Sequence, residues 1–167
     1  PLYKKAADFE IETTDKKPIE AAKTILELSK NQIKTEICVV ITADNVKDAL
    51  NDIKKGASAD LIELRLDFIK NINKNGIKNL LINKKQKIIA TCRPVKFGGL
   101  FKGNEKERLS LLKTAIENGA DFVDIEFESE IINEIIQNKK LAKIIISHHD
   151  FNKTPSLENL NLLYKKI

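Results

Sequence analysis

The chain has 167 residues, of which 42% are hydrophobic and 32% charged, a composition typical of folded globular proteins and not of disordered ones. No apolar run approaches the ~20 residues that a membrane-spanning helix needs, so we expect no membrane association. The net charge of +5 is spread along the chain without the basic stripe and interleaved aromatic residues typical of nucleic-acid binding, so nucleic acid is not an expected partner.

The pattern of predicted elements changes at about residue 36. Before it, the sequence predicts a short strand over residues 6–14 and one helix over residues 18–29. After it, five runs rich in β-branched residues predict strands over residues 37–42, 61–67, 87–93, 122–127 and 143–150. Apolar residues three to four positions apart predict helices over residues 45–56, 105–118, 131–136 and 157–163.

Strands that alternate with helices about every 25 residues imply parallel pairing through right-handed crossovers. The choice between an open doubly wound sheet and a barrel rests on alternate side chains within each strand. Glu63 and Arg65 share one face of the second strand, with Ile62 and Leu64 on the other. The later strands repeat this division, and their polar members are Thr91, Arg93, Asp124, Glu126, Ser147 and His149.

An open sheet would bury these charges under helices at a cost of several kcal/mol per ion, whereas a barrel leaves one face of the sheet toward a polar mouth. The sequence therefore predicts an α/β fold, a partial (β/α)8 barrel. Eight strand–helix units need about 250 residues, and about five fit in this chain. Its first and fifth strands would be left with unpaired edges, which predicts self-association.

Two histidines and two cysteines stand out in the predicted strands. His149 shares the face of Ser147 and is expected to reach the mouth of the barrel as a general acid and base. His148 has the opposite parity and is expected to pack under the helices. Cys38 and Cys92 form no metal-binding spacing, and we expect buried thiols in a reducing cytoplasm.

Arginine is scarce in this chain, which has only Arg65, Arg93 and Arg108 among 29 basic residues. Where lysine serves as the general cation, an arginine indicates a need for its planar fork, which binds a carboxylate through two parallel hydrogen bonds. Arg65 and Arg93 would meet His149 at one mouth, as expected for a site that binds a small acid. Alternatively, the same charges form ion pairs that only neutralise a polar barrel end.

Four segments carry a family resemblance: ELRLD at 63–67, TCRP with the following GG at 91–99, GADFVDIE at 119–126 and SHHDFNKTP at 147–155. In this order the segments resemble type I 3-dehydroquinate dehydratase, over about residues 36–167. The resemblance implies that Glu63, Arg65 and Arg93 bind substrate, that His149 is the catalytic acid and base, and that Asp124 orients it. It implies the substrate 3-dehydroquinate, an imine mechanism, and no metal or organic cofactor.

The chain departs from the family pattern at two places. Phe97 stands where many members have a glutamate before the paired glycines. The imine-forming lysine lies on the sixth strand in the family, some 25 residues beyond the histidine, and is expected after Ile167, so that this 167-residue chain alone is expected to be inactive.

The first residues, PLYKKAADFEIETTDKKPIEAAKTILEL, are similar to the C-terminal end of shikimate kinase. We therefore expect residues 1–35 to be a kinase-like remnant with a linker, and residues 36–167 to be the N-terminal part of the dehydratase barrel. This order implies a fused shikimate-pathway polypeptide of the AROM type, for which a homodimer is a candidate assembly. Two alternatives are another imine-forming barrel lyase or aldolase, and a non-catalytic segment of a multifunctional protein.

Overall fold

The computed structural model describes residues 17–30 and 35–167, and the chain divides into two compact units, Pro1–Thr35 and Glu36–Ile167. In the first unit, helix α2 spans Pro18–Lys30, in agreement with the predicted helix over residues 18–29. The strand predicted over residues 6–14 lies outside the described residues. No helix in the described ranges is long and apolar enough to cross a bilayer.

The second unit is built on one parallel sheet with the strand order β1-β2-β3-β4-β5, which confirms the predicted partial barrel. The strands are β1 (Cys38–Ile41), β2 (Leu61–Arg65), β3 (Lys87–Thr91), β4 (Phe122–Glu126) and β5 (Lys143–Ser147). Each strand pairs in parallel with the next one along the chain. Strands β1 and β5 are therefore the two edges of the sheet.

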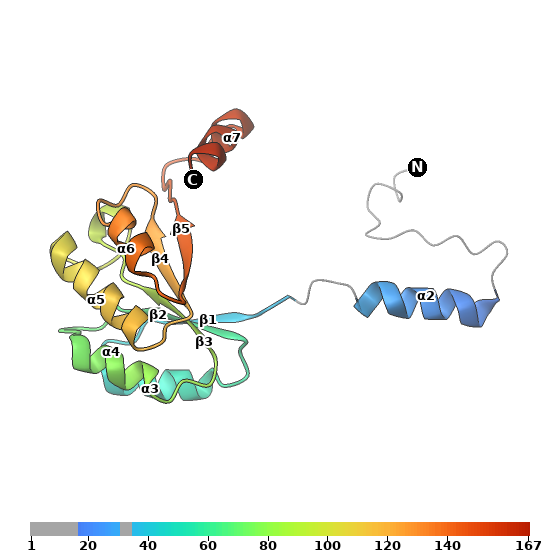
Figure 1. The fold of residues 1–167 in the computed structure, drawn as a ribbon, viewed down its shortest axis with the longest axis horizontal. Coiled ribbons are helices and arrows are strands. Elements are labelled where there is room, and N and C mark those ends of the chain that lie inside the picture. Colours follow the sequence, from blue (N-terminus) through green and yellow to red (C-terminus); the bar gives the residue numbers. More distant parts are fainter. Residues whose placement is uncertain (1–16, 31–34) are drawn as a thin grey trace. The chain divides into compact units, whose positions relative to one another are not determined.

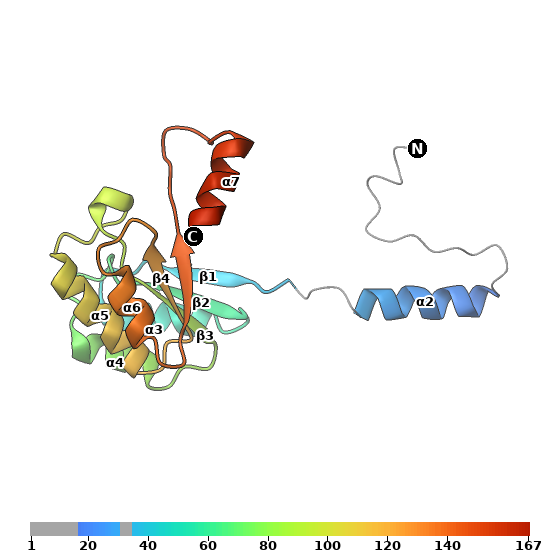
Figure 2. The same cartoon turned by 45° about the horizontal axis from the view of Figure 1, so that its top comes forward.

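Helices α3 to α6 cover one face of this sheet (Figures 1 and 2), and each packs against the next. The helices of the unit are α3 (Val46–Lys55), α4 (Lys74–Leu81), α5 (Glu105–Glu117), α6 (Ile132–Asn138) and α7 (Leu157–Lys166). Helix α4 follows β2 and is absent from the helices predicted above. Its apolar stripe of Ile77, Leu80 and Leu81 covers little more than one turn, and Gly76 within the helix weakens the helical signal.

Side-chain caps explain where the helices begin. Asn45, Asn73 and Ser156 precede α3, α4 and α7, and each side chain accepts a hydrogen bond from a backbone N–H in the first turn. Helix α5 has a full capping box, in which the Asn104 side chain binds the Glu107 backbone and the Glu107 side chain binds the Asn104 backbone. These caps fix the helix starts at the carboxyl ends of the preceding strands.

The hydrophobic core lies between the sheet and the covering helices. Its strand residues have the parity that the sequence predicts, with Ile62, Leu64, Ile88, Val123 and Ile125 almost fully buried. The opposite face of the sheet is left for the polar side chains described below.

The strands are shorter than predicted, and this difference matters for the site. Strand β3 ends at Thr91 and β5 ends at Ser147, so Arg93 and His149 both lie two residues past the last residue of a strand. The prediction assumes that strand pairing continues as far as Arg93 and His149. In the structure, the loops that follow β3 and β5 place these two side chains.

Two predictions about burial are wrong. His148 does not pack under the helices: it is exposed, and its Nδ1 contacts the carboxylate of Glu128. The alternation of faces stops where β5 stops, so parity carries no information about His148. Cys38 is also exposed, because it begins the edge strand β1, while Cys92 is buried as predicted.

Candidate functional site

The register of the sheet aligns polar residues from three neighbouring strands. Arg65 is paired with Thr91, and Thr91 with Asp124. In parallel strands, residues in the same row direct their side chains to the same face. Arg65 and Thr91 are the last residues of β2 and β3, and Asp124 is the middle residue of β4, so the row lies toward the carboxyl end of the sheet, the end of a (β/α)8 barrel at which active sites are built.

Arg93 is the centre of a cluster of polar contacts. Its Nη2 donates to Asp124 Oδ1 at 2.8 Å, and its Nη1 lies 3.0 Å from His149 Nε2. The hydroxyl of Ser147 donates to the same oxygen of Asp124 at 3.0 Å. Asp124 thus joins the loop after β3 to the end of β5 through one carboxylate.

The contact between Arg93 and His149 fixes the state of the imidazole. A guanidinium has only donors, so Nε2 must accept the hydrogen bond, and the proton of the neutral ring is then on Nδ1. Nδ1 is buried and has no hydrogen-bond partner among the described residues. The imidazole is therefore neutral, with its basic atom Nε2 directed at Arg93.

Electrostatics act on His149 in the same direction. Burial lowers the pKa of its imidazole, and the positive charge of Arg93 lowers it further, while Asp124 and Glu126 partly oppose them. At neutral pH the ring is therefore mostly unprotonated. A neutral imidazole in this position can accept a proton once a ligand draws Arg93 away from Nε2.

The loop that carries His149 packs on the loop that carries Arg93. The rings of His149 and Phe151 are stacked, with centroids 5.9 Å apart and planes inclined by 14°. Phe151 lies over Gly98, which has a φ of +80°, and a Cβ there would be 2.3 Å from the Phe151 ring. At Gly99 a Cβ would lie 2.0 Å from the carbonyl oxygen of Arg93. The paired glycines therefore allow this close packing.

Glu63 and Arg65 lie on the neighbouring strand and have their own partners. The hydroxyl of Thr91 donates to Glu63 at 2.8 Å, and Arg65 binds Asp67 through Nε and Nη2 at 2.9 and 2.7 Å. This bidentate contact is the main reason that the pKa of Arg65 is raised, and the charges of Glu63 and Asp124 contribute. Arg65 is thus within electrostatic range of the Arg93 cluster.

The structure therefore brings Arg93, Asp124 and His149 into one chain of contacts. It places Glu63 and Arg65 beside that chain, on the same face of the sheet, without a direct hydrogen bond to His149 among the described residues. In residues 17–30 and 35–167, no group of three or more His, Cys, Asp or Glu side chains could hold a metal ion.

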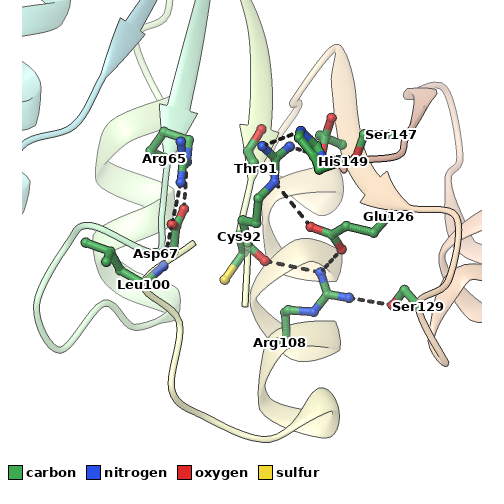
Figure 3. A network of polar contacts seen from close by, with 12 residues as sticks. Arg65, Asp67, Thr91, Cys92, Leu100, Arg108, Glu126, Ser129, Ser147 and His149 are labelled. Atoms are coloured by element: carbon green, nitrogen blue, oxygen red, sulfur yellow. Dashed lines mark hydrogen bonds and ion pairs between the residues drawn. The ribbon is translucent and has the colours of Figure 1, made fainter. Parts of the chain in front are cut away.

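Three residues behind this cluster were not predicted as part of it. Arg108 on α5 donates to Glu126 at 2.7 Å and contacts Ser129 (Figure 3). The sequence contains two signals for Arg108: arginine is scarce, and Arg108 lies four residues before Leu112, on the apolar stripe of its helix. The sequence pattern predicts the polar face for Glu126 but no role, and nothing in it indicates Ser129.

Comparison with known proteins gives a family for residues 37–167, which match the family model for type I 3-dehydroquinase. The chain is 39% identical over 135 residues to a 3-dehydroquinate dehydratase of Methanocaldococcus jannaschii, over 78% of this chain and 60% of that protein. It is 35% identical over 137 residues to a chloroplastic bifunctional 3-dehydroquinate dehydratase/shikimate dehydrogenase of Arabidopsis thaliana, over 78% of this chain and 23% of that protein.

Solved structures give the same result. A type I 3-dehydroquinate dehydratase of Clostridium difficile, with covalently modified comenic acid, superposes with a TM-score of 0.68 and 35% identity, over 75% of this chain and 55% of its own. The enzyme of Enterococcus faecalis superposes with a TM-score of 0.71 and 28% identity, over 78% and 60%. The chain spans about three fifths of the length of the archaeal relatives that it matches. It belongs to the type I 3-dehydroquinase family.

Proposed function

We propose that residues 36–167 are the N-terminal part of a 3-dehydroquinate dehydratase. This hydro-lyase removes water from 3-dehydroquinate to give 3-dehydroshikimate, the third step of the shikimate pathway of aromatic amino acid biosynthesis. The observation that carries the proposal is the contact at 3.0 Å between Arg93 Nη1 and His149 Nε2. It combines an anion-binding fork and a neutral base at the carboxyl end of the sheet, in a chain whose relatives are named as dehydratases.

The contacts support a role for each predicted residue. Arg93 and Arg65 have planar forks that suit the carboxylate and hydroxyl groups of the substrate, and Glu63 can accept a hydroxyl hydrogen bond. When the substrate carboxylate takes over donors of Arg93, Nε2 of His149 is released as the general base. Asp124, which binds both Arg93 and Ser147, holds this arrangement in place.

The chemical steps need a nucleophilic lysine, which we place in the residues that follow Ile167. Its amine condenses with the substrate ketone to give an imine and water. His149 then accepts the proton from the adjacent carbon and returns a proton to the departing hydroxyl, which leaves as water. Hydrolysis of the imine regenerates the lysine and releases 3-dehydroshikimate.

We also propose that residues 1–35 are the end of a shikimate kinase-like domain and its linker, fused to the dehydratase. The similarity of the first 30 residues to that kinase supports this division. The relative from Arabidopsis thaliana, which combines a dehydratase with a shikimate dehydrogenase, is a precedent for fusion in this family.

We further propose a cytoplasmic location and a homodimeric assembly. Both cysteines are free thiols, which supports a reducing compartment.

Borohydride reduction in the presence of 3-dehydroquinate tests the proposal. The polypeptide that extends past Ile167 is expected to gain a reduced covalent adduct on one lysine, and mass spectrometry of its peptides should find that lysine outside this chain. The 167-residue chain alone is the matched control and should gain none. An adduct within residues 1–167 would contradict the placement of the lysine, and an extended polypeptide that neither forms an adduct nor dehydrates the substrate would contradict the function.

A further inference from the structure

Behind the Arg93 cluster lies a buried charged pair, Arg108 and Glu126. The Arg108 side chain is 0% exposed and that of Glu126 is 1% exposed, and Arg108 Nη1 lies 2.7 Å from Glu126 Oε2. Removing two charges from water opposes folding. A buried pair in this position therefore needs a geometric reason, since apolar residues of similar volume would fill the same space without that cost.

The Arg108 guanidinium is held on all sides. Its Nη1 also donates to the carbonyl oxygen of Cys92 at 3.2 Å, and its Nη2 donates to Glu105 at 3.0 Å and contacts the hydroxyl of Ser129. Helix α5, the end of β3 and the turn after β4 are thereby tied to one fork. Because Cys92 directly precedes Arg93, the same fork fixes the backbone from which Arg93 projects.

Glu126 contacts both Arg108 and Arg93 and so links the buried pair to the site. One of its oxygens, Oε2, is taken by Arg108, and the other, Oε1, faces Arg93 Nε at 3.4 Å. Both facing atoms are buried and have no hydrogen-bond partner within the described chain. Arg93 is therefore held from two sides, by Asp124 at its tip and by Glu126 at its Nε.

We propose that Arg108 and Glu126 are positioning residues, which fix the guanidinium of Arg93 against His149 from behind the sheet. Neither residue needs to touch the substrate. Arg108 holds Glu126 in one orientation, and Glu126 restricts the rotation of Arg93 about its long side chain. The effect on substrate binding rests on the proposed function, whereas the effect on Arg93 itself does not.

The three arginines of the chain provide a direct measurement. Phenylglyoxal modifies guanidinium groups, and peptide mapping by mass spectrometry reports the rate for each arginine separately. The side chains of Arg65 and Arg93 are 15% and 13% exposed, and each is bound to a carboxylate. Arg65 is therefore an internal reference for Arg93. The ratio of the two modification rates can be measured in the 167-residue chain or in a longer one, and in a monomer or an oligomer.

The variants are Arg108→Lys, which keeps the charge but not the fork, and Glu126→Gln, which keeps an acceptor for Arg108 but removes the charge that faces Arg93. Each is expected to raise the rate for Arg93 relative to Arg65 about tenfold, because a lost charge-assisted contact opens a site locally by about that factor. Lys113→Ala is the matched control on α5, since Lys113 pairs with Glu134 at 3.6 Å at the surface. It should leave the ratio unchanged.

In the extended enzyme, the two variants should also raise KM for 3-dehydroquinate by about tenfold, because a small misplacement of a substrate-binding group costs about that factor or more. An unchanged ratio of Arg93 to Arg65 in folded variants would overturn the proposal, since a merely structural pair affects stability alone. If Arg108→Lys does not fold, Ser129→Ala, which removes one anchor of the fork, replaces it with the same expectation. An extended enzyme without activity would refute the proposed function and leave the ratio as the test.

Discussion

The contact between Arg93 and Asp124 allows a magnitude to be worked out. Their side chains are 13% and 10% exposed, and the hydrogen bond between them is 2.8 Å long. Asp124→Asn preserves shape and one acceptor, so the Arg93 guanidinium keeps a hydrogen bond but loses its charged partner, which moves the contact from the upper to the lower end of the ~1.5–3 kcal/mol range for bonds to charged groups. Glu126 still faces Arg93 and limits the loss. We therefore expect the free energy of unfolding to fall by about 1.5 kcal/mol.

Urea denaturation at neutral pH measures this change as a lower midpoint with an unchanged slope. Asp44→Asn is the matched control, because Asp44 pairs with Lys70 at 2.6 Å with side chains that are 64% and 75% exposed, and such surface pairs contribute only about 0–1 kcal/mol. Equal losses in the two variants would refute the reasoning, since they would show that the Arg93 contact is no stronger than a solvated ion pair.

The same variant has a second readout in His149. The charge of Asp124 raises the pKa of His149 against the stronger lowering by burial and Arg93. Asp124→Asn should therefore lower that pKa further, and titration of the ring signals by NMR would detect it. The chain has only two histidines, so His148, which contacts Glu128, is the reference in the same spectrum. A rise in the pKa of His149 would mean that Arg93 had moved away from it.

Three further predictions concern pH, backbone strain and assembly. Because the pKa of His149 is lowered below its ordinary 6.5, the unfolded chain binds a proton at a higher pH than the folded chain. The free energy of unfolding should therefore decrease below pH 6.5 and level off below the pKa of the folded state. In denaturant titrations, His149→Gln should show a smaller decrease between neutral and acidic pH, and an identical pH dependence would contradict this. Gly98→Ala should lower the free energy of unfolding by about 1–2 kcal/mol because a side chain is strained at a φ of +80°, and an unchanged denaturation midpoint would count against the observed loop. The edges of β1 and β5, which pair with no further strand among the described residues, should make the 167-residue chain self-associate in sedimentation experiments, whereas a cooperatively unfolding monomer would disprove this.

The fold was predictable because its signals are local and repeated. β-branched runs alternating with helical stripes determine parallel pairing, and the polar parity of Glu63, Arg65 and Asp124 selects the barrel. The same parity failed for His148, which lies past the end of β5. Parity is a property of a hydrogen-bonded ladder, and sequence does not mark the residue at which a ladder ends. Cys38 was misjudged for a related reason, since an edge strand has an apolar sequence without the burial that an inner strand has.

The site was predictable to the extent that its residues follow the ends of strands. The sequence pattern indicates Arg93 and His149 because they share strand parity with Thr91 and Ser147, and the loops after β3 and β5 bring their side chains into contact. The partners of Glu63 and Arg65 were not, because Thr91 lies on another strand and Asp67 lies past the end of β2. Such pairings depend on sheet register and on turns, which a residue pattern in one strand does not specify.

Arg108 shows what a compositional signal contains and what it lacks. Scarcity of arginine indicated that each one is used for its fork, and in the structure Arg65, Arg93 and Arg108 all bind carboxylates. Helical periodicity also places Arg108 on the apolar stripe of α5, four residues before Leu112 and seven before Ala115, but a period does not identify the partners that a buried charge needs. The charge is tolerated there only because Glu126, Glu105, Ser129 and the Cys92 carbonyl all meet it. Since Glu126, Ser129 and the Cys92 carbonyl all lie outside α5, the burial of Arg108 is a consequence of the assembled barrel, and so is the position that it gives to Arg93.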